Sequence, residues 1–253
     1  METIIDVKGL CKTYVVNKNS NNVLRNIDFT LKEGEFISIM GPSGSGKSTM
    51  LYTVSGMDKA TSGEITFLGK HYADMKDKEM ARERLVSMGF IFQQMYMMRK
   101  LCVLDNILLP AFHAGLKDRA AIREEAEMLM RRLGIMEIAD NEITEVSGGQ
   151  LQRACLCRAL INHPKVLFAD EPTGALNSKA AGEVINELSK INKEGTAILM
   201  VTHSARVAAA SDRVIYLIDG HIEGDIELGK LKDEADLTQR EHRINKWLME
   251  QGW

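Results

Sequence analysis

The stretch that most constrains this chain is the segment 36–49, FISIMGPSGSGKST, in which a short apolar run meets a cluster of glycines. The run 36–40 predicts a buried strand, and from Gly46 onward the residues suit the start of a helix. Glycines at such a junction let the backbone N–H groups point inward, and the helix N-terminus adds its positive dipole. The spacing Gly41-x4-Gly46-Lys47-Ser48 is the P-loop pattern, which predicts binding of nucleotide phosphates with magnesium.

Each residue type of this pattern has a chemical reason. Lys47 supplies a full positive charge to the phosphates, and the Ser48 hydroxyl is placed to ligate the metal. A plain glycine-rich turn is the alternative, but the position between a strand-like run and a helix-like segment favours the nucleotide site. The predicted phosphate-binding residues are Gly41, Ser43, Gly44, Ser45, Gly46, Lys47, Ser48 and Thr49.

Composition limits the partners of the chain. Its 253 residues allow a substantial apolar core. Lys and Arg total 32 and Asp and Glu total 35, so the formal net charge is −3, which gives no general attraction to nucleic acid. The four cysteines lack metal-ligand spacing, as is typical of reduced thiols in a cytosolic protein. We find neither a signal pattern nor an apolar run near the ~18 residues of a membrane span, so any membrane contact is expected through a partner.

Alternating and continuous apolar patterns predict the strands. Ile27, Phe29 and Leu31 alternate with polar residues, which predicts antiparallel strands with one buried face over 1–35. The Asn-rich segment 17–22 is predicted to be an exposed loop. Buried strands are predicted at the apolar runs 89–92, 166–169, 197–201 and 214–218, and the last of these is expected to be the final strand.

Helical spacing predicts the remaining elements. The segment 94–158 reads as a helical insertion, with Ile122, Ala126, Leu129, Met130 and Leu133 on one face. Met95, Met97 and Met98 begin it, and their flexible side chains suit either core packing or an adaptable partner groove. Charged residues predict a surface helix over 74–84, and an amphipathic helix is predicted at 181–191. In the charged tail, one helical face that could pack on the domain or on a partner carries Leu237, Ile244, Trp247 and Leu248.

Polar residues follow the predicted strands at their carboxyl ends, where functional loops of open α/β sheets gather. Asp170 is predicted to hold magnesium, directly or through water, and Glu171 to orient the attacking water. Gln93 or Gln94 is predicted to sense the nucleotide's metal, with a solvated loop glutamine as the alternative. His203 is predicted to contact the γ-phosphate, with a packed core histidine as the alternative.

A second candidate anion site lies at 146–150, where Ser147 stands at a helix cap position before Gly148 and Gly149. One nucleotide does not need two helix N-termini from distant places. Two chains could each offer one site to the same nucleotide, and a head-to-tail dimer would then close on two ATP molecules. A simple capped helix is the alternative. Tyr14 is a candidate platform for a nucleotide base, or simply an aromatic on a strand.

With these residues in view, the chain resembles the ATP-binding cassette (ABC) family, the nucleotide-binding subunits of ABC transporters, over about 4–224. The resemblance rests on the P-loop, on 146–150 as the family signature, on 169–172 as the Walker B end and on His203. It implies an α/β P-loop NTPase fold with a mainly parallel RecA-like core, an antiparallel β subdomain and a helical subdomain. The ABC ATPase domain is expected over 1–228, with 94–158 inserted, and a helical tail over 229–253.

The same match implies roles for individual residues. Tyr14 falls at the base-stacking aromatic and Gln93 at the Q-loop glutamine. The signature residues Ser147, Gly148, Gly149 and Gln150 belong to the nucleotide site. Catalysis is implied for Glu171 and His203, and metal binding for Ser48, Gln93 and Asp170.

Within the family, the stretches 89–93, 106–110 and 169–176 are similar to a narrower group. It includes cassettes for macrolide export, lipoprotein release and bacitracin-type peptide resistance. The resemblance implies ATP and magnesium, a homodimer, an integral membrane permease as partner and a place at the cytoplasmic face of the cell membrane. It points to export, extraction or resistance. The alternatives are the ATPase of an uptake system and a soluble cassette protein that acts on ribosomes or DNA.

Two positions depart from the family pattern. Val146 replaces the usual leucine of the signature, a small change at an apolar position. Asn177 stands where the family has an aspartate. The amide keeps its hydrogen-bonding capacity but loses the charge, so altered coupling between the two nucleotide sites is expected. Hydrolysis is expected to persist because Glu171 is present.

Overall fold

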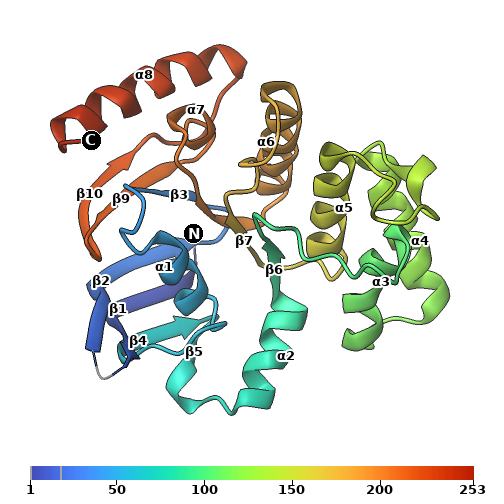
Figure 1. Ribbon diagram of the computed structural model, residues 1–253, viewed down its shortest axis with the longest axis horizontal. Helices are drawn as coiled ribbons and strands as arrows, with labels where there is room; N and C mark the ends of the chain where they lie inside the picture. The colour runs from blue at the N-terminus through green and yellow to red at the C-terminus, as the bar shows by residue number, and fades with distance from the viewer. Residues whose placement is uncertain (1, 18) are drawn as a thin grey trace.

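A computed structural model describes residues 2–17 and 19–253. Its N-terminal part is an antiparallel sheet with the strand order β2-β1-β4-β5 (Figure 1). The strands are β1 (Thr3–Val16), β2 (Asn19–Lys32), β4 (Ser62–Phe67) and β5 (Lys70–His71). Ile27, Phe29 and Leu31 are buried whereas Asp28 is exposed, which confirms the predicted antiparallel strands and their buried face.

Four residues of the Asn-rich segment, 19–22, form strand in a β-hairpin, so the predicted loop over 17–22 is wrong. Asn19 to Asn22 belong to β2 and pair with β1 as far as Thr13. Their side chains are exposed, as predicted, and residue 18 lies outside the described residues. Asn17 has a φ of +51°, which suits the tight turn of a hairpin. Polar composition indicated exposure correctly, but backbone pairing with β1 keeps these residues extended.

The second sheet has six strands in the order β10-β9-β3-β8-β7-β6. Five of them run parallel: β3 (Phe36–Met40), β6 (Met88–Ile91), β7 (Val166–Asp170), β8 (Ala197–Val201) and β9 (Arg213–Ile218). The predicted strands are therefore confirmed. The prediction that 214–218 is the last strand is wrong, because β10 (His221–Glu227) pairs antiparallel with β9 at the edge of the sheet. Most of its residues are charged or half-exposed, as is common at a sheet edge, so the segment lacks the apolar run that predicts a buried strand.

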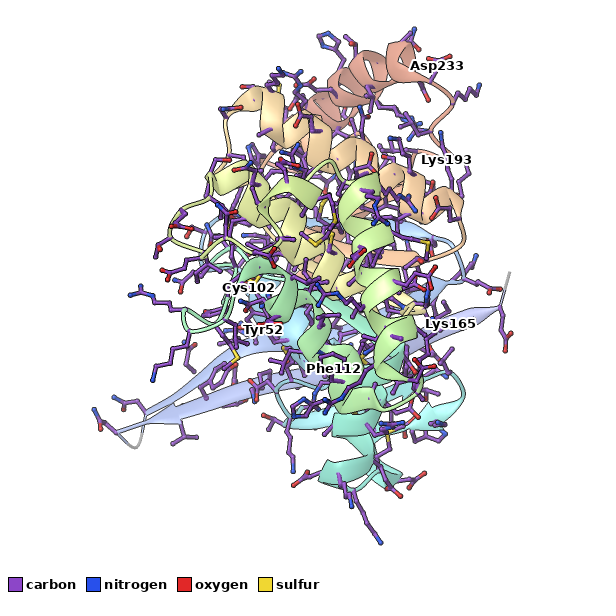
Figure 2. The ribbon with its side chains drawn as sticks, turned by 90° about the vertical axis from the view of Figure 1, so that its right-hand side faces the viewer. Tyr52, Cys102, Phe112, Lys165, Lys193 and Asp233 are labelled. Carbon is purple, nitrogen blue, oxygen red and sulfur yellow. The ribbon has the colours of Figure 1, made fainter. Side chains whose placement is uncertain are left out.

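Helix α1 (Lys47–Val54) follows β3 on the P-loop side of the molecule. Helix α2 (Asp77–Ser87), which follows a short 3-10 turn, confirms the predicted charged surface helix. Helices α3 (Val103–Ala114), α4 (Arg119–Arg132) and α5 (Gly148–Leu160) gather at the opposite end (Figure 1). Figure 2 faces this end, with Cys102 before α3 and Phe112 near its close. The predicted inner face of α4 is buried at Ile122, Ala126 and Met130.

These helices lie between β6 and β7 in the chain, which are neighbours in the sheet. The boundaries proposed above for the subdomain and the whole domain remain predictions. Between these helices and the tail lie α6 (Ser178–Lys193) and α7 (Ala205–Ala208), and the 3-10 turns are η1 (Tyr72–Asp74) and η2 (Met136–Ile138).

The tail forms α8 (Glu234–Glu250), which packs on the domain across β9, β10 and α7 (Figure 1). Ile244 and Leu248 are buried with Val214 and Tyr216. The predicted helical face of the tail is thus occupied by this chain itself. Arg240 is buried in the same contact.

None of the four cysteines forms a disulfide, and Cys155 and Cys157 are buried in α5. Burial raises the pKa of Cys155 to about 11, so its thiol stays protonated and unreactive. Over the described residues, every helix is too short or too polar to cross a bilayer.

Candidate nucleotide site

The P-loop joins β3 to α1 and depends on close backbone approaches. A Cβ on Gly41 would lie 2.1 Å from the carbonyl oxygen of Leu217, and one on Gly46 would lie 2.9 Å from that of Val23. Gly46 also has a φ of +102° and precedes the first residue of α1, a conformation that glycine adopts without strain. Close packing, as well as the turn itself, therefore requires glycine at these two positions.

The loop folds around Lys47, whose Nζ donates to the carbonyl oxygens of Gly41 and Pro42 at 2.9 and 2.8 Å. Burial lowers the pKa of Lys47, although the nearby carboxylates Glu171 and Asp170 oppose this shift. Ser45 is 2% exposed and its Oγ makes no hydrogen bond within the described chain. A buried hydroxyl without a partner calls for an acceptor or donor from a ligand, and phosphate oxygens at this loop would supply one.

Asp170, the last residue of β7, faces α1 and is 7% exposed. Ser48 donates its hydroxyl to Oδ1 of Asp170 at 2.9 Å, and Tyr52 donates its hydroxyl to Oδ2 at 2.7 Å. The structure thus brings together two predicted metal ligands, Ser48 and Asp170. Tyr52 was missed in the sequence, although its position four residues after Ser48 places both on one face of the helix.

Glu171 gathers two other predicted residues. His203 Nε2 lies 2.8 Å from Oε1 of Glu171, and Gln93 Nε2 donates to Oε2 at 3.3 Å. Glu171 has a φ of +46°, a left-handed backbone that costs about 1–3 kcal/mol in a residue other than glycine. Its backbone N–H donates to Val201 O at 3.0 Å. Backbone strain of this kind is typical of functional sites, so it supports a functional role for Glu171.

Gln93 opens a loop of unusual backbone. Met95 and Tyr96 have φ values of +60° and +45°. Arg158 of α5 holds this turn by donating to Met95 O at 2.6 Å and to Tyr96 O at 2.8 Å. Of the methionines that could serve either core or groove, Met97 packs against the core and Met98 is 53% exposed.

Beside this loop lies a groove of about 350 Å³ between α2, β6, α3 and α5. We call it the apolar groove. It is lined by Met57, Ala81, Arg84, Leu85, Met88, Gly89, Phe90, Phe92, Tyr96, Pro110, Arg158, Ala159 and Asn162. Met57 and Tyr96 are 43% and 61% exposed, so the groove offers large apolar side chains to solvent.

The signature stretch caps α5 as expected. Ser147 Oγ accepts from the N–H of Gln150 at 3.3 Å, and Gln150 Oε1 accepts from the N–H of Ser147 at 2.9 Å. Ser147 and Gly148 are exposed. Figure 1 shows the α5 helix separated from α1 by the ribbons of β6 and β7. A single chain therefore does not bring Ser147, Gly148 and Gly149 to the P-loop.

Tyr14 lies on β1 with 38% of its surface exposed. Its hydroxyl donates to Asp58 Oδ2 at 2.5 Å, and Lys12 Nζ lies 4.7 Å from the centre of its ring. Burial and Asp58 raise the pKa of Tyr14, while Thr49 of the P-loop helix opposes the shift. The ring is thus held beside the P-loop, where a base could stack on it.

Asn177 caps α6, and its Oδ1 accepts from the N–H of Ala180 at 2.9 Å. An aspartate at this position could make the same bond, so the amide preserves the cap and loses only the charge. Val146 is partly buried against the core, as expected for an apolar signature position.

A cavity of about 610 Å³ borders Glu171 and His203. Residues of α6, α7 and α8 line it, among them Ile185, Val207 and Leu237. The catalytic candidates therefore face an open space that the tail helix helps to enclose.

Comparison with known proteins agrees with this geometry. The family described as ABC transporter matches residues 24–174. The chain belongs to the ABC transporter family. It is an ATPase subunit of this family.

The chain is 41% identical over 236 residues to the bacitracin export ATP-binding protein BceA of Halalkalibacterium halodurans, covering 93% of this chain and 92% of that protein. It is 39% identical over 225 residues to the macrolide export ATP-binding/permease protein MacB of Escherichia coli, covering 89% of this chain and 35% of MacB. A dimeric post-hydrolysis structure of the cassette MJ0796 with ADP and Pi has a TM-score of 0.84 and 36% identity, covering 90% of this chain and all of that one. The expected α/β cassette fold is confirmed.

The residues present fit magnesium. Ser48 and Asp170 offer a hydroxyl and a carboxylate oxygen 2.9 Å apart, and Gln93 adds an amide that contacts the next carboxylate in the chain, Glu171. Magnesium prefers oxygen ligands and is commonly held by one or two carboxylates together with phosphates. This donor set, beside a phosphate-binding loop, suits that chemistry.

Proposed function

We propose that two copies of this ABC ATPase close around two ATP molecules and drive a separate membrane permease at the cytoplasmic face of the cell membrane. The observation that carries this proposal is the separation of the two anion-binding halves within one chain. Lys47 of the P-loop is near enough to Glu171 for their charges to interact. The signature end of α5 is exposed, and α5 lies beyond β6 and β7 (Figure 1). A second copy in head-to-tail arrangement supplies the missing half of each site. The dimeric state of the MJ0796 cassette supports it.

The residues divide the chemistry between them. Lys47 and the inward backbone N–H groups of the P-loop stabilise phosphate charge. Ser48, Asp170 and Gln93 would hold magnesium, which neutralises charge on the phosphate oxygens when bound. Glu171 orients the attacking water and accepts its proton, and His203 fixes the Glu171 carboxylate through the 2.8 Å contact.

The apolar groove is the surface that we propose for the permease. It exposes Met57 and Tyr96, and exposed apolar clusters on soluble subunits mark interaction sites. Phe92 lines the groove directly before Gln93, which contacts Glu171. A permease segment that contacts Phe92 in the groove would thus lie one residue from Gln93, the hydrogen-bond donor to Glu171.

Export or antimicrobial-peptide resistance is the proposed direction of transport. It rests on the similarity to BceA, which covers 93% of the chain, and to MacB. In MacB the chain matches about a third of a protein named for both ATP-binding and permease parts.

The test is recovery of the tagged chain from its native cells in mild detergent, followed by identification of what co-purifies. We expect an integral membrane permease. Tyr96→Ser should weaken this recovery, whereas Leu116→Ser, which changes an apolar residue of 55% exposure outside the groove, should not. Recovery with ribosomes or DNA and without a membrane protein would refute the proposal. A permease that imports its substrate would contradict the export direction alone.

A further inference from the structure

Two hydroxyls of α1 hold the two oxygens of one carboxylate. Ser48 donates to Oδ1 of Asp170 at 2.9 Å, and Tyr52, one helical turn later, donates to Oδ2 at 2.7 Å. Asp170 is 7% exposed, so little solvent competes for these oxygens. Each oxygen of the carboxylate therefore has a separate protein donor.

Contacts hold both the backbone and the ring of Tyr52 in place. Its backbone carbonyl accepts N–H donors from Met57 and Asp58 at 2.9 and 3.0 Å as the chain leaves α1. Its ring packs against Phe92 with the ring centres 6.3 Å apart, and against the core beneath the sheet.

We propose that Tyr52 is a positioning residue that holds Oδ2 of Asp170 and so directs Oδ1, on the Ser48 side, towards the magnesium ion. An ionised carboxylate has two equivalent oxygens and can turn about its Cβ–Cγ bond. A hydroxyl donor to one oxygen stops this rotation, and hydrogen bonds to ionised acceptors are short and strong. Outer partners of metal ligands typically change metal affinity about 10–100-fold when they are removed.

This inference rests on the proposed magnesium site, and the test separates the two. Tyr52→Phe keeps the ring against Phe92 and removes only the donor. We would measure Mn²⁺ binding to the nucleotide-bound protein by electron paramagnetic resonance, the Mg²⁺ concentration for half-maximal hydrolysis, and binding of a fluorescent ATP analogue in EDTA.

We expect Tyr52→Phe to weaken metal binding and raise the half-saturating Mg²⁺ concentration about tenfold, with analogue binding in EDTA changed less than about twofold. Tyr72→Phe is the matched control, because the Tyr72 hydroxyl donates to Val54 O at the end of the same helix, away from Asp170. It should keep the wild-type metal dependence.

Wild-type metal affinity in Tyr52→Phe would overturn the inference. So would an equal loss of analogue binding in EDTA, because that would indicate a general structural role. Failure of the magnesium site itself has a different signature: the wild-type protein would hydrolyse ATP without Mg²⁺, or Asp170→Asn would bind Mn²⁺ as tightly as the wild type.

Discussion

Arg240 is the residue on which the attachment of the tail helix depends most. Its side chain is 6% exposed and donates to the carbonyl oxygens of Ala209, Ser211, Leu228 and Gly229, at 3.3, 3.1, 3.4 and 2.8 Å, and to Asp236 at 2.8 Å. These carbonyls belong to the segments after α7 and after β10. One guanidinium thus joins three parts of the chain.

Arg240→Met keeps much of the aliphatic bulk and removes every donor. Hydrogen bonds from a charged donor contribute about 1.5–3 kcal/mol each, but only the bonds to Ser211 and Gly229 among the four carbonyls are shorter than 3.3 Å. The desolvation cost of a buried guanidinium offsets part of their sum. We therefore expect a loss of about 3 kcal/mol in the free energy of unfolding, which lowers Tm by about 6–12 °C.

The measurement is denaturant and thermal unfolding followed by circular dichroism. Arg243→Met is the control, because Arg243 lies exposed on the same helix and should change the free energy of unfolding by no more than about 0.5 kcal/mol. A loss below about 1 kcal/mol in Arg240→Met, or an equal loss in the control, would refute the assignment of Arg240 as the anchor of α8.

Three further outcomes follow from the site. His203→Ala should lower kcat for ATP hydrolysis about 100-fold with ATP affinity nearly unchanged, and an unaltered kcat would contradict the role of the Glu171 contact. Burial favours the neutral form of Asp58, but Lys12 and Tyr14 outweigh it and hold the pKa of Asp58 below its ordinary 3.8. As pH falls, Asp58 is therefore protonated in the unfolded chain before it is protonated in the folded chain. The stability that Asp58 contributes is present above pH 3.8 and is lost as pH falls further. The Tm difference between wild type and Asp58→Asn should shrink there, and a constant difference would contradict the ion pair. GTP should also be hydrolysed, because base stacking contributes only about 1–3 kcal/mol and accepts any base; steady-state assays that show complete rejection of GTP would oppose this.

Local patterns were sufficient where one segment carries its own signal. The P-loop, the strand before Asp170 and the cap at Ser147 each depend on neighbours within a few residues, and all three appear as predicted. The family resemblance predicted that distant segments share one site. In the structure, Gln93 and His203 both contact the carboxylate of Glu171.

Pairing between distant segments explains what was missed. The 19–22 segment is strand because β1 supplies its hydrogen bonds, and β10 exists because β9 offers an edge. Tyr52 was not singled out in the sequence, because its contact is with Asp170, which lies 118 residues further along the chain. Such contacts are set by tertiary structure, and no local period encodes them.

The central claim is that ATP joins two copies of this chain, and the most direct measurement is the molar mass of Glu171→Gln by light scattering with ATP and Mg²⁺. Loss of the carboxylate base should stop hydrolysis and leave binding intact, so we expect about twice the monomer mass with ATP and the monomer mass without it. A variant that stays monomeric with saturating ATP, beside a wild-type monomer that hydrolyses ATP at a rate independent of protein concentration, would contradict the account.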